Sequence, residues 1–142
     1  MPQIDFYIVD NSSPDGWLRY ACKIIEKAYT LGMHVHIRTI DESMTNKMDD
    51  LLWVFRDQSF IPHQHTCTEN ELCAVTLNHS ELPNKRELLV NLAPDVPDFY
   101  QQFERVVEVI GDIELMKQNG RERFKIYKEN GDSPTHHQVQ LS

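Results

Sequence analysis

Apolar side chains recur along this chain at two spacings, at alternate positions in some stretches and at every third or fourth position in others. Residues 3–9 are rich in β-branched and aromatic side chains and predict a strand. The inner half of this stretch is almost wholly apolar, which indicates burial on both faces, as in a parallel sheet. Residues 17–28 carry apolar side chains on one helical face, and Gly32 marks the end of the predicted helix. A second strand is predicted over residues 33–40, followed by a helix that Asp41 caps.

The same order of elements continues in the second half of the chain. Short apolar runs predict strands over residues 74–77 and 87–92. Residues 105–110 either extend a short preceding helix or form a fifth strand, and their four β-branched side chains favour the strand. Residues 115–130 predict the last helix, with Gly131 at its end.

Alternating strands and helices predict an α/β fold with right-handed crossovers. We expect a single domain over residues 1–131, built on a mostly parallel sheet of about five strands with helices on both faces, and therefore Rossmann-like. Residues 132–142 are polar, contain Pro134 and are expected to form a flexible tail.

The charge of the chain limits the partners that it can bind. Its 142 residues carry a formal net charge of −8, which makes strong direct binding to nucleic acid unfavourable. The charge is uneven, because residues 117–142 hold five Lys or Arg and three Asp or Glu, which leaves residues 1–116 with a net charge of −10. A compact basic patch on an acidic body suits an acidic peptide better than long DNA.

Cysteine usage and hydropathy predict a cytoplasmic protein. Cys22, Cys67 and Cys73 are odd in number and have no disulfide-framework spacing, which is typical of a reducing compartment. The first residues lack the basic and apolar segments of a signal peptide. No apolar run approaches the roughly 20 residues of a membrane span, so no contact with a membrane is expected.

The turn after the first predicted strand lacks a phosphate-binding motif. Residues 10–16 contain neither the P-loop spacing nor G-x-G-x-x-G. Pro14 also removes a backbone donor at the position where a phosphate would need one. Nucleotide binding is therefore not expected, and no catalytic constellation and no cofactor are predicted.

A loop after the second predicted helix holds four side chains with donor atoms that suit zinc: His63, His65, Cys67 and Cys73. Their spacing matches no zinc-ligand pattern that coordination geometry explains. A polar loop is the preferred interpretation, and a metal-dependent enzyme that uses this loop is the alternative.

Large apolar side chains continue past the end of the second predicted helix: Trp53, Phe60, Ile61 and Pro62. Connections between elements usually run over the surface and are polar. Apolar side chains at this position therefore either cover the core or form a hydrophobic docking site for a protein.

The last predicted helix carries a row of cations on one face: Lys117, Arg121, Lys125 and Lys128. Phe124 lies on the same side of the helix as Arg121. An apolar ring beside cations can accept a peptide that carries acidic groups and ends in an aromatic residue. The end of such a peptide is itself a carboxylate, which Arg can hold with two hydrogen bonds. Cations near a helix C-terminus also favour the helix dipole and solubility, and periodicity alone does not separate the two interpretations.

Five groups of residues, in order from position 6 to position 131, carry a resemblance to a known family. They are Phe6-Tyr7 with the following apolar pair and Asp10, then residues 48–53, 59–63 and 103–109, and finally residues 121–125 with Tyr127 and Gly131. The most specific of these are Leu-Trp followed by Phe-x-Pro-His, and the Arg-rich last helix. On these residues the chain resembles the chi subunits of bacterial DNA polymerase III, which belong to the clamp-loader assembly.

The resemblance implies a non-catalytic α/β adaptor subunit with two protein partners in DNA replication. One is the acidic C-terminal tail of the single-stranded-DNA-binding protein, and the other is the small psi subunit or a helicase in its place. The implied tail site consists of Ile110, Lys117, Arg121 and Phe124. The implied psi or helicase site consists of Trp53, Phe60, Ile61 and Pro62.

The chain departs from the family pattern at Asn119-Gly120, just before Arg121. A glycine inside a helix costs about 1 kcal/mol relative to alanine. The helix is therefore expected to begin later or to bend at this point.

Overall fold

The computed structural model describes residues 2–10, 16–54, 75–78, 86–111 and 113–140. The strands are β1 (Gln3–Asp10), β2 (Val35–Arg38), β3 (Val75–Asn78), β4 (Leu88–Asn91), β5 (Arg105–Gly111) and β6 (Thr135–Gln140). The helices are α1 (Gly16–Thr30), α2 (Glu42–Val54) and α3 (Glu114–Glu129), with one turn of 3-10 helix, η1 (Tyr100–Gln102). The predicted order of strands and helices up to α3 is therefore confirmed.

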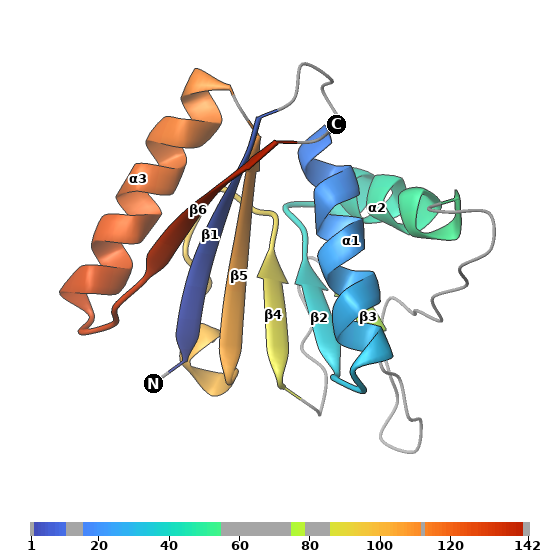
Figure 1. Cartoon of the computed structure of the whole chain (residues 1–142), viewed down its shortest axis with the longest axis horizontal. Coiled ribbons are helices and arrows are strands. Elements are labelled where there is room, and N and C mark those ends of the chain that lie inside the picture. The colour runs from blue at the N-terminus through green and yellow to red at the C-terminus, as the bar shows by residue number, and fades with distance from the viewer. Residues whose placement is uncertain (1, 11–15, 55–74, 79–85, 112, 141–142) are drawn as a thin grey trace.

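One parallel sheet connects all six strands, in the order β3-β2-β4-β5-β1-β6 (Figure 1). The predicted α/β fold with a parallel sheet is confirmed, with six strands where about five were expected. The stretch after η1 forms strand β5 and does not extend a helix, and all its residues from Val106 to Gly111 are buried. Strand β5 lies between β4 and β1, where its β-branched residues are covered on both faces.

The sixth strand comes from the part of the chain that was expected to be a flexible tail. Residues Thr135–Gln140 form β6, which pairs with β1 from Asp5↔Thr135 to Asp10↔Gln140. Most of its described side chains are exposed, so no apolar alternation marks it in the sequence. It is a strand because its main chain pairs with the edge of β1, which lies about 130 residues earlier in the chain.

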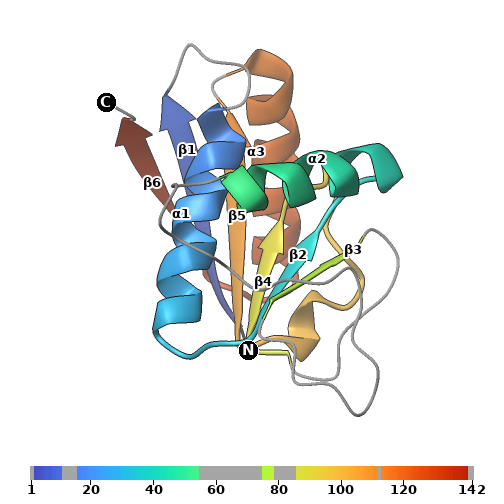
Figure 2. The same ribbon diagram turned by 90° about the vertical axis from the view of Figure 1, so that its right-hand side faces the viewer.

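The helices cover both faces of the sheet, as predicted. Figures 1 and 2 show α1 and α2 on one side and α3 on the other. On the first face, Leu18 and Ile25 of α1 and Met48 of α2 are buried in one apolar cluster with sheet residues that include Val90 and Val107. On the second face, Tyr127 of α3 and Tyr100 and Phe103 at η1 are buried in one apolar cluster. Phe6 of β1 and Ile110 of β5 belong to the same cluster. Two separate apolar clusters therefore hold the sheet from its two sides.

The expected start and stop signals of the first two helices are in place. The Asp41 carboxylate accepts a hydrogen bond of 2.8 Å from the backbone N–H of Met44, which caps α2. Gly32 follows α1 with φ +82°, in the left-handed region that favours glycine. Residues 11–15, where the sequence lacks a phosphate-binding motif, lie outside the described residues.

Candidate functional site

A groove of about 480 Å³ lies between α3 and the strands at the β6 edge of the sheet. It is lined by Phe6 and Ile8 of β1, Ile110 of β5, Lys117, Gly120, Arg121 and Phe124 of α3, and His136 and Gln138 of β6. All four residues of the predicted tail site thus lie in one groove. This groove, named the α3–β6 groove below, is the candidate functional site.

The floor of the α3–β6 groove is aromatic and aliphatic. Phe6 is 2% exposed, and its ring centroid lies 5.3 Å from that of Phe124. The Tyr127 ring packs edge-on against Phe6 from the core side, with centroids 5.8 Å apart. Ile110 is also buried and completes the floor from β5. The floor is therefore a packed apolar surface that can receive an apolar side chain.

Gly120 lets α3 approach the sheet closely. The expectation that the helix begins after this glycine is wrong. Helix α3 begins at Glu114, one and a half turns before Gly120, and includes Lys117. A Cβ atom on Gly120 would lie 2.3 Å from Cδ1 of Ile110, which is too close for van der Waals contact. The intrinsic cost of a helical glycine is thus offset by the packing of the helix on β5.

The four cations predicted to share one face of α3 have different surroundings in the structure. Arg121 lines the groove with 68% of its side chain exposed, and its guanidinium lies 3.6 Å from the carboxylate of Glu114. An exposed pair at this distance contributes little and can exchange for another carboxylate. The Lys128 ammonium lies 5.4 Å from the centroid of the Phe124 ring, while Lys125 is exposed and outside the groove lining. The predicted cationic face therefore contributes Lys117 and Arg121 to the groove itself.

Sequence reasoning missed the residues that β1 and the edge strand β6 contribute. Ile4, Phe6 and Ile8 occupy alternate positions along β1. This period of two could have predicted that Phe6 and Ile8 lie on the same face of the sheet, which is the face that lines the groove. No apolar alternation marks the β6 residues in the sequence, and residues 132–142 were therefore expected to be flexible. His136 lies in the groove lining with its ring centroid 6.1 Å from that of Phe124.

The next residue along β6 points to the opposite face of the sheet. The His137 ring stacks on Tyr7 with centroids 4.9 Å apart. Its Nε2 lies 3.3 Å from the carboxylate of Asp5, which also accepts a hydrogen bond of 2.6 Å from the Thr135 hydroxyl. Burial raises the pKa of Asp5, but its hydrogen bonds to Thr135, His137 and Arg105 outweigh this and hold the pKa below the ordinary value. These contacts anchor β6 on β1.

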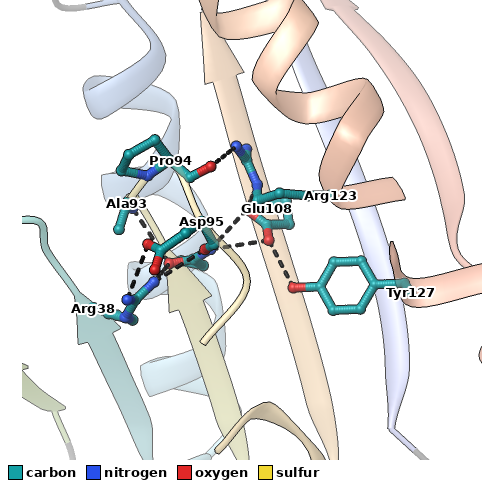
Figure 3. Close-up of polar contacts among 8 residues, drawn as sticks. Arg38, Ala93, Pro94, Asp95, Glu108, Arg123 and Tyr127 are labelled. Carbon is teal, nitrogen blue, oxygen red and sulfur yellow. Dashed lines mark hydrogen bonds and ion pairs between the residues drawn. The ribbon is translucent and has the colours of Figure 1, made fainter. Parts of the chain in front are cut away.

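A buried polar network lies between α3 and the centre of the sheet (Figure 3). Glu108 of β5 is completely buried, and its carboxylate accepts hydrogen bonds from Arg123 Nε at 3.1 Å and from the Tyr127 hydroxyl at 2.7 Å. Both carboxylate oxygens also accept from the Asn91 amide, at 3.1 and 2.9 Å. Burial raises the pKa of the Glu108 carboxyl, and the guanidinium of Arg123 opposes this shift. Two of the four donor contacts on this carboxylate come from α3, and they fix the position of α3 over β5.

The network continues from Asn91 toward the surface. The Arg38 guanidinium donates to the Asn91 side-chain oxygen at 3.1 Å and lies 3.0 Å from the carboxylate of Asp95. Arg123 donates to the backbone carbonyl of Pro94 at 2.9 Å. Figure 3 shows these groups converging from β2, β5, α3 and the segment after β4. The described donors and acceptors are used within the network, so this cluster supports the groove and is not a second site.

The other predicted sites fall wholly or partly outside the described residues. Trp53 belongs to α2, but its side chain is not described, and Phe60, Ile61 and Pro62 lie outside the described ranges. The loop with His63, His65, Cys67 and Cys73 lies outside them too. Within the described ranges, no group of three or more His, Cys, Asp or Glu side chains could hold a metal ion. No helix in this part of the chain is both long and apolar enough to cross a membrane.

Comparison with known proteins gives one consistent result. Residues 1–135 match the family model described as DNA polymerase III chi subunit, HolC. The DNA polymerase III subunit chi of Pseudomonas aeruginosa is 36% identical over 132 residues, which cover 92% of each chain. The subunit chi of Escherichia coli is 27% identical over 138 residues, which cover 92% of this chain and 94% of the relative. That of Haemophilus influenzae is 26% identical over 124 residues, covering 84% and 85%. The chain therefore belongs to the family of DNA polymerase III chi subunits.

Proposed function

We propose that this chain is a non-catalytic adaptor that binds the acidic C-terminal tail of the single-stranded-DNA-binding protein in the α3–β6 groove. The observation that carries the proposal is the meeting of an apolar floor and a cationic rim in one groove, on a chain with a net charge of −8. The floor accepts the last apolar side chain of the tail. The Arg121 guanidinium holds the terminal carboxylate with two hydrogen bonds, and Lys117 attracts the acidic residues that precede it.

An adaptor needs a second partner surface besides the α3–β6 groove. Helix α2, which carries Trp53, packs on the face of the sheet opposite α3. In this proposal a psi subunit or a helicase binds at Trp53, Phe60, Ile61 and Pro62, while the acidic tail binds in the α3–β6 groove. Binding both partners at once raises the effective concentration of the replication machinery at coated single-stranded DNA.

The tail proposal is tested with peptides that differ only in the terminal carboxylate. We expect a fluorescent peptide with several aspartates and a C-terminal phenylalanine to bind as the free acid and to bind at least tenfold more weakly as the amide. Fluorescence anisotropy measures both affinities. Binding of the free acid should weaken as salt rises to physiological strength, where screening acts over about 8 Å. Equal binding of acid and amide would contradict the proposed carboxylate contact.

Arg121→Glu is expected to remove peptide binding, because it deletes the carboxylate partner and adds repulsion. Lys23→Glu is the matched control, since it makes the same change of charge at an exposed position of α1, on the other face of the sheet. Lys125→Ala should have a small effect, because one exposed rim charge contributes at most about 1 kcal/mol. If Lys23→Glu weakens binding as much as Arg121→Glu, the attraction is a property of overall charge and the groove is not the site.

The proposed psi or helicase surface is tested by Phe60→Ala, with thermal unfolding and partner binding measured on the same variant. We expect partner binding to weaken by roughly 2 kcal/mol or more, as at an interface hot spot. Retained binding with a strongly lowered melting temperature would mean that Phe60 covers the core and does not contact the partner.

A further inference from the structure

Among the described residues that line the α3–β6 groove, one is a histidine. His136 enters the groove from β6 and is exposed, with its ring edge-on to Phe124 at a centroid distance of 6.1 Å. Histidine is the side chain whose ordinary pKa lies within the physiological pH range. A proton on this imidazole would therefore change the charge of the groove without any change of fold.

The groups that face His136 define how a ligand would act on it. Helix α3 presents the cations Lys117 and Arg121, and the Lys128 ammonium lies 5.4 Å from the centroid of the Phe124 ring. The groove residues from β1 and β5 are apolar, and Gln138 on β6 is neutral. Among the described residues that line the groove none is acidic, and the nearby Glu114 is engaged with Arg121. An acidic ligand therefore brings to His136 the negative charge that the groove lining lacks.

We propose that His136 is a proton-linked contact of the α3–β6 groove, which takes up a proton when an acidic peptide with a free terminal carboxylate binds. This inference rests on the proposed function. The carboxylates of the peptide favour the protonated imidazole. By linkage, the protonated imidazole then raises the affinity for the peptide by the same factor. The chain thus binds an acidic tail more tightly at mildly acidic pH than at alkaline pH.

The experiment measures peptide affinity between about pH 8 and about pH 5.5 at constant ionic strength, with the labelled free-acid peptide whose N-terminus is blocked. Aspartate side chains remain ionised over this range, so the peptide itself contributes little to any change. We expect the affinity of the natural chain to rise several-fold, up to about tenfold, as pH falls, since tenfold corresponds to one unit of pKa change on binding. His136→Gln should show less than about a twofold change.

The neighbouring histidine provides a matched control. His137→Gln removes an imidazole from the same strand, but on the opposite face, where the ring contacts Tyr7 and Asp5. It should keep the rise of affinity with falling pH. His136→Arg should bind at about pH 8 as tightly as the natural chain binds at about pH 5.5, with little dependence on pH, because its charge is permanent. In the natural chain, the NMR titration of the His136 ring protons should move to higher pH when the peptide is added.

The possible outcomes separate this inference from the proposed function. If the natural chain and His136→Gln show the same rise in affinity, the inference is overturned while carboxylate-dependent binding at Arg121 stands. An unchanged NMR titration of His136 in the presence of bound peptide also overturns it. If the natural chain does not bind the peptide at any pH, the proposed function and this inference both fall.

Discussion

Two arginines that lie two positions apart on α3 have opposite environments. The side chain of Arg121 is 68% exposed and lines the groove, whereas that of Arg123 is 6% exposed and pairs with the buried Glu108. Residues two positions apart in a helix face away from each other, so one arginine is available to a ligand and the other is part of the core. In the sequence both are simply cations of an Arg-rich helix.

At the scale of single residues, Arg123→Met is expected to lower the free energy of unfolding by about 3 kcal/mol or more. Removal of one partner leaves the Glu108 carboxylate buried without its cation, and such changes are strongly destabilising. Chemical denaturation measures the effect. The matched variant Arg121→Glu should change the free energy of unfolding by less than about 0.5 kcal/mol, as expected for an exposed position. Similar stability losses in the two variants would contradict the distinct roles assigned to them.

At the scale of elements, β6 decides whether the groove is complete. It contributes His136 and Gln138 to the groove on one face. On the other face, Thr135 and His137 contact the carboxylate of Asp5 in β1. A strand at the edge of a sheet can therefore complete a groove even when its own side chains are mostly polar.

A chain that ends at Asp132 tests the role of β6. We expect its free energy of unfolding to fall by at least about 2 kcal/mol, because Asp5 loses two hydrogen-bond partners and charged acceptors contribute about 1.5–3 kcal/mol for each hydrogen bond. Peptide binding should be lost, since one wall of the groove is removed. A chain that ends at Asp132 keeps the hydrogen bond of 2.6 Å that the Tyr100 hydroxyl donates to the Asp132 carboxylate. If the residues after Asp132 were a flexible tail, their removal would change neither the melting temperature nor peptide binding, and this outcome would contradict the prediction.

At the scale of the whole molecule, burial of the sheet on both faces makes stability depend on pH. His36 lies in β2, between β3 and β4, and is 2% exposed. Its Nδ1 is 2.7 Å from the Thr76 hydroxyl, and its ring stacks on Phe103. Burial, together with the charges of Arg86 and Arg38, lowers the pKa of His36 to about 4. The folded chain therefore keeps this histidine neutral over a range in which the unfolded chain protonates it.

We expect the contribution of His36 to the free energy of unfolding to fall as pH decreases from about 6.5 to about 4, by at most roughly 3 kcal/mol. The sign follows because the folded pKa lies below the unfolded one, so the unfolded state binds more protons in this range. Asp5, whose pKa is also lowered, adds a further loss only below about pH 4. Urea denaturation at several pH values measures the slope between pH 6.5 and pH 4. His36→Gln should flatten it, and His136→Gln, at an exposed position, should not.

The sequence by itself determined the elements and the chemistry of the predicted tail site. Strands β1 to β5 and the three helices follow from local periodicity, and the Asp41 cap and the Gly32 stop follow from local backbone requirements. Arg121 and Phe124 could be chosen because three positions on a helix bring two side chains to one side. These features depend on residues that are close together in the chain.

Only the tertiary structure decided which of these residues meet, because the remaining features depend on contacts between distant segments. Polar residues 135–140 became a strand through pairing with β1, and this brought His136 into the groove. Gly120 is explained by its close approach to Ile110 of β5, which lies ten residues earlier and across the interface between helix and sheet. Arg123 became a core residue because Glu108 is buried beneath it. Hydrophobic periodicity does not encode such pairings, since it describes one segment at a time.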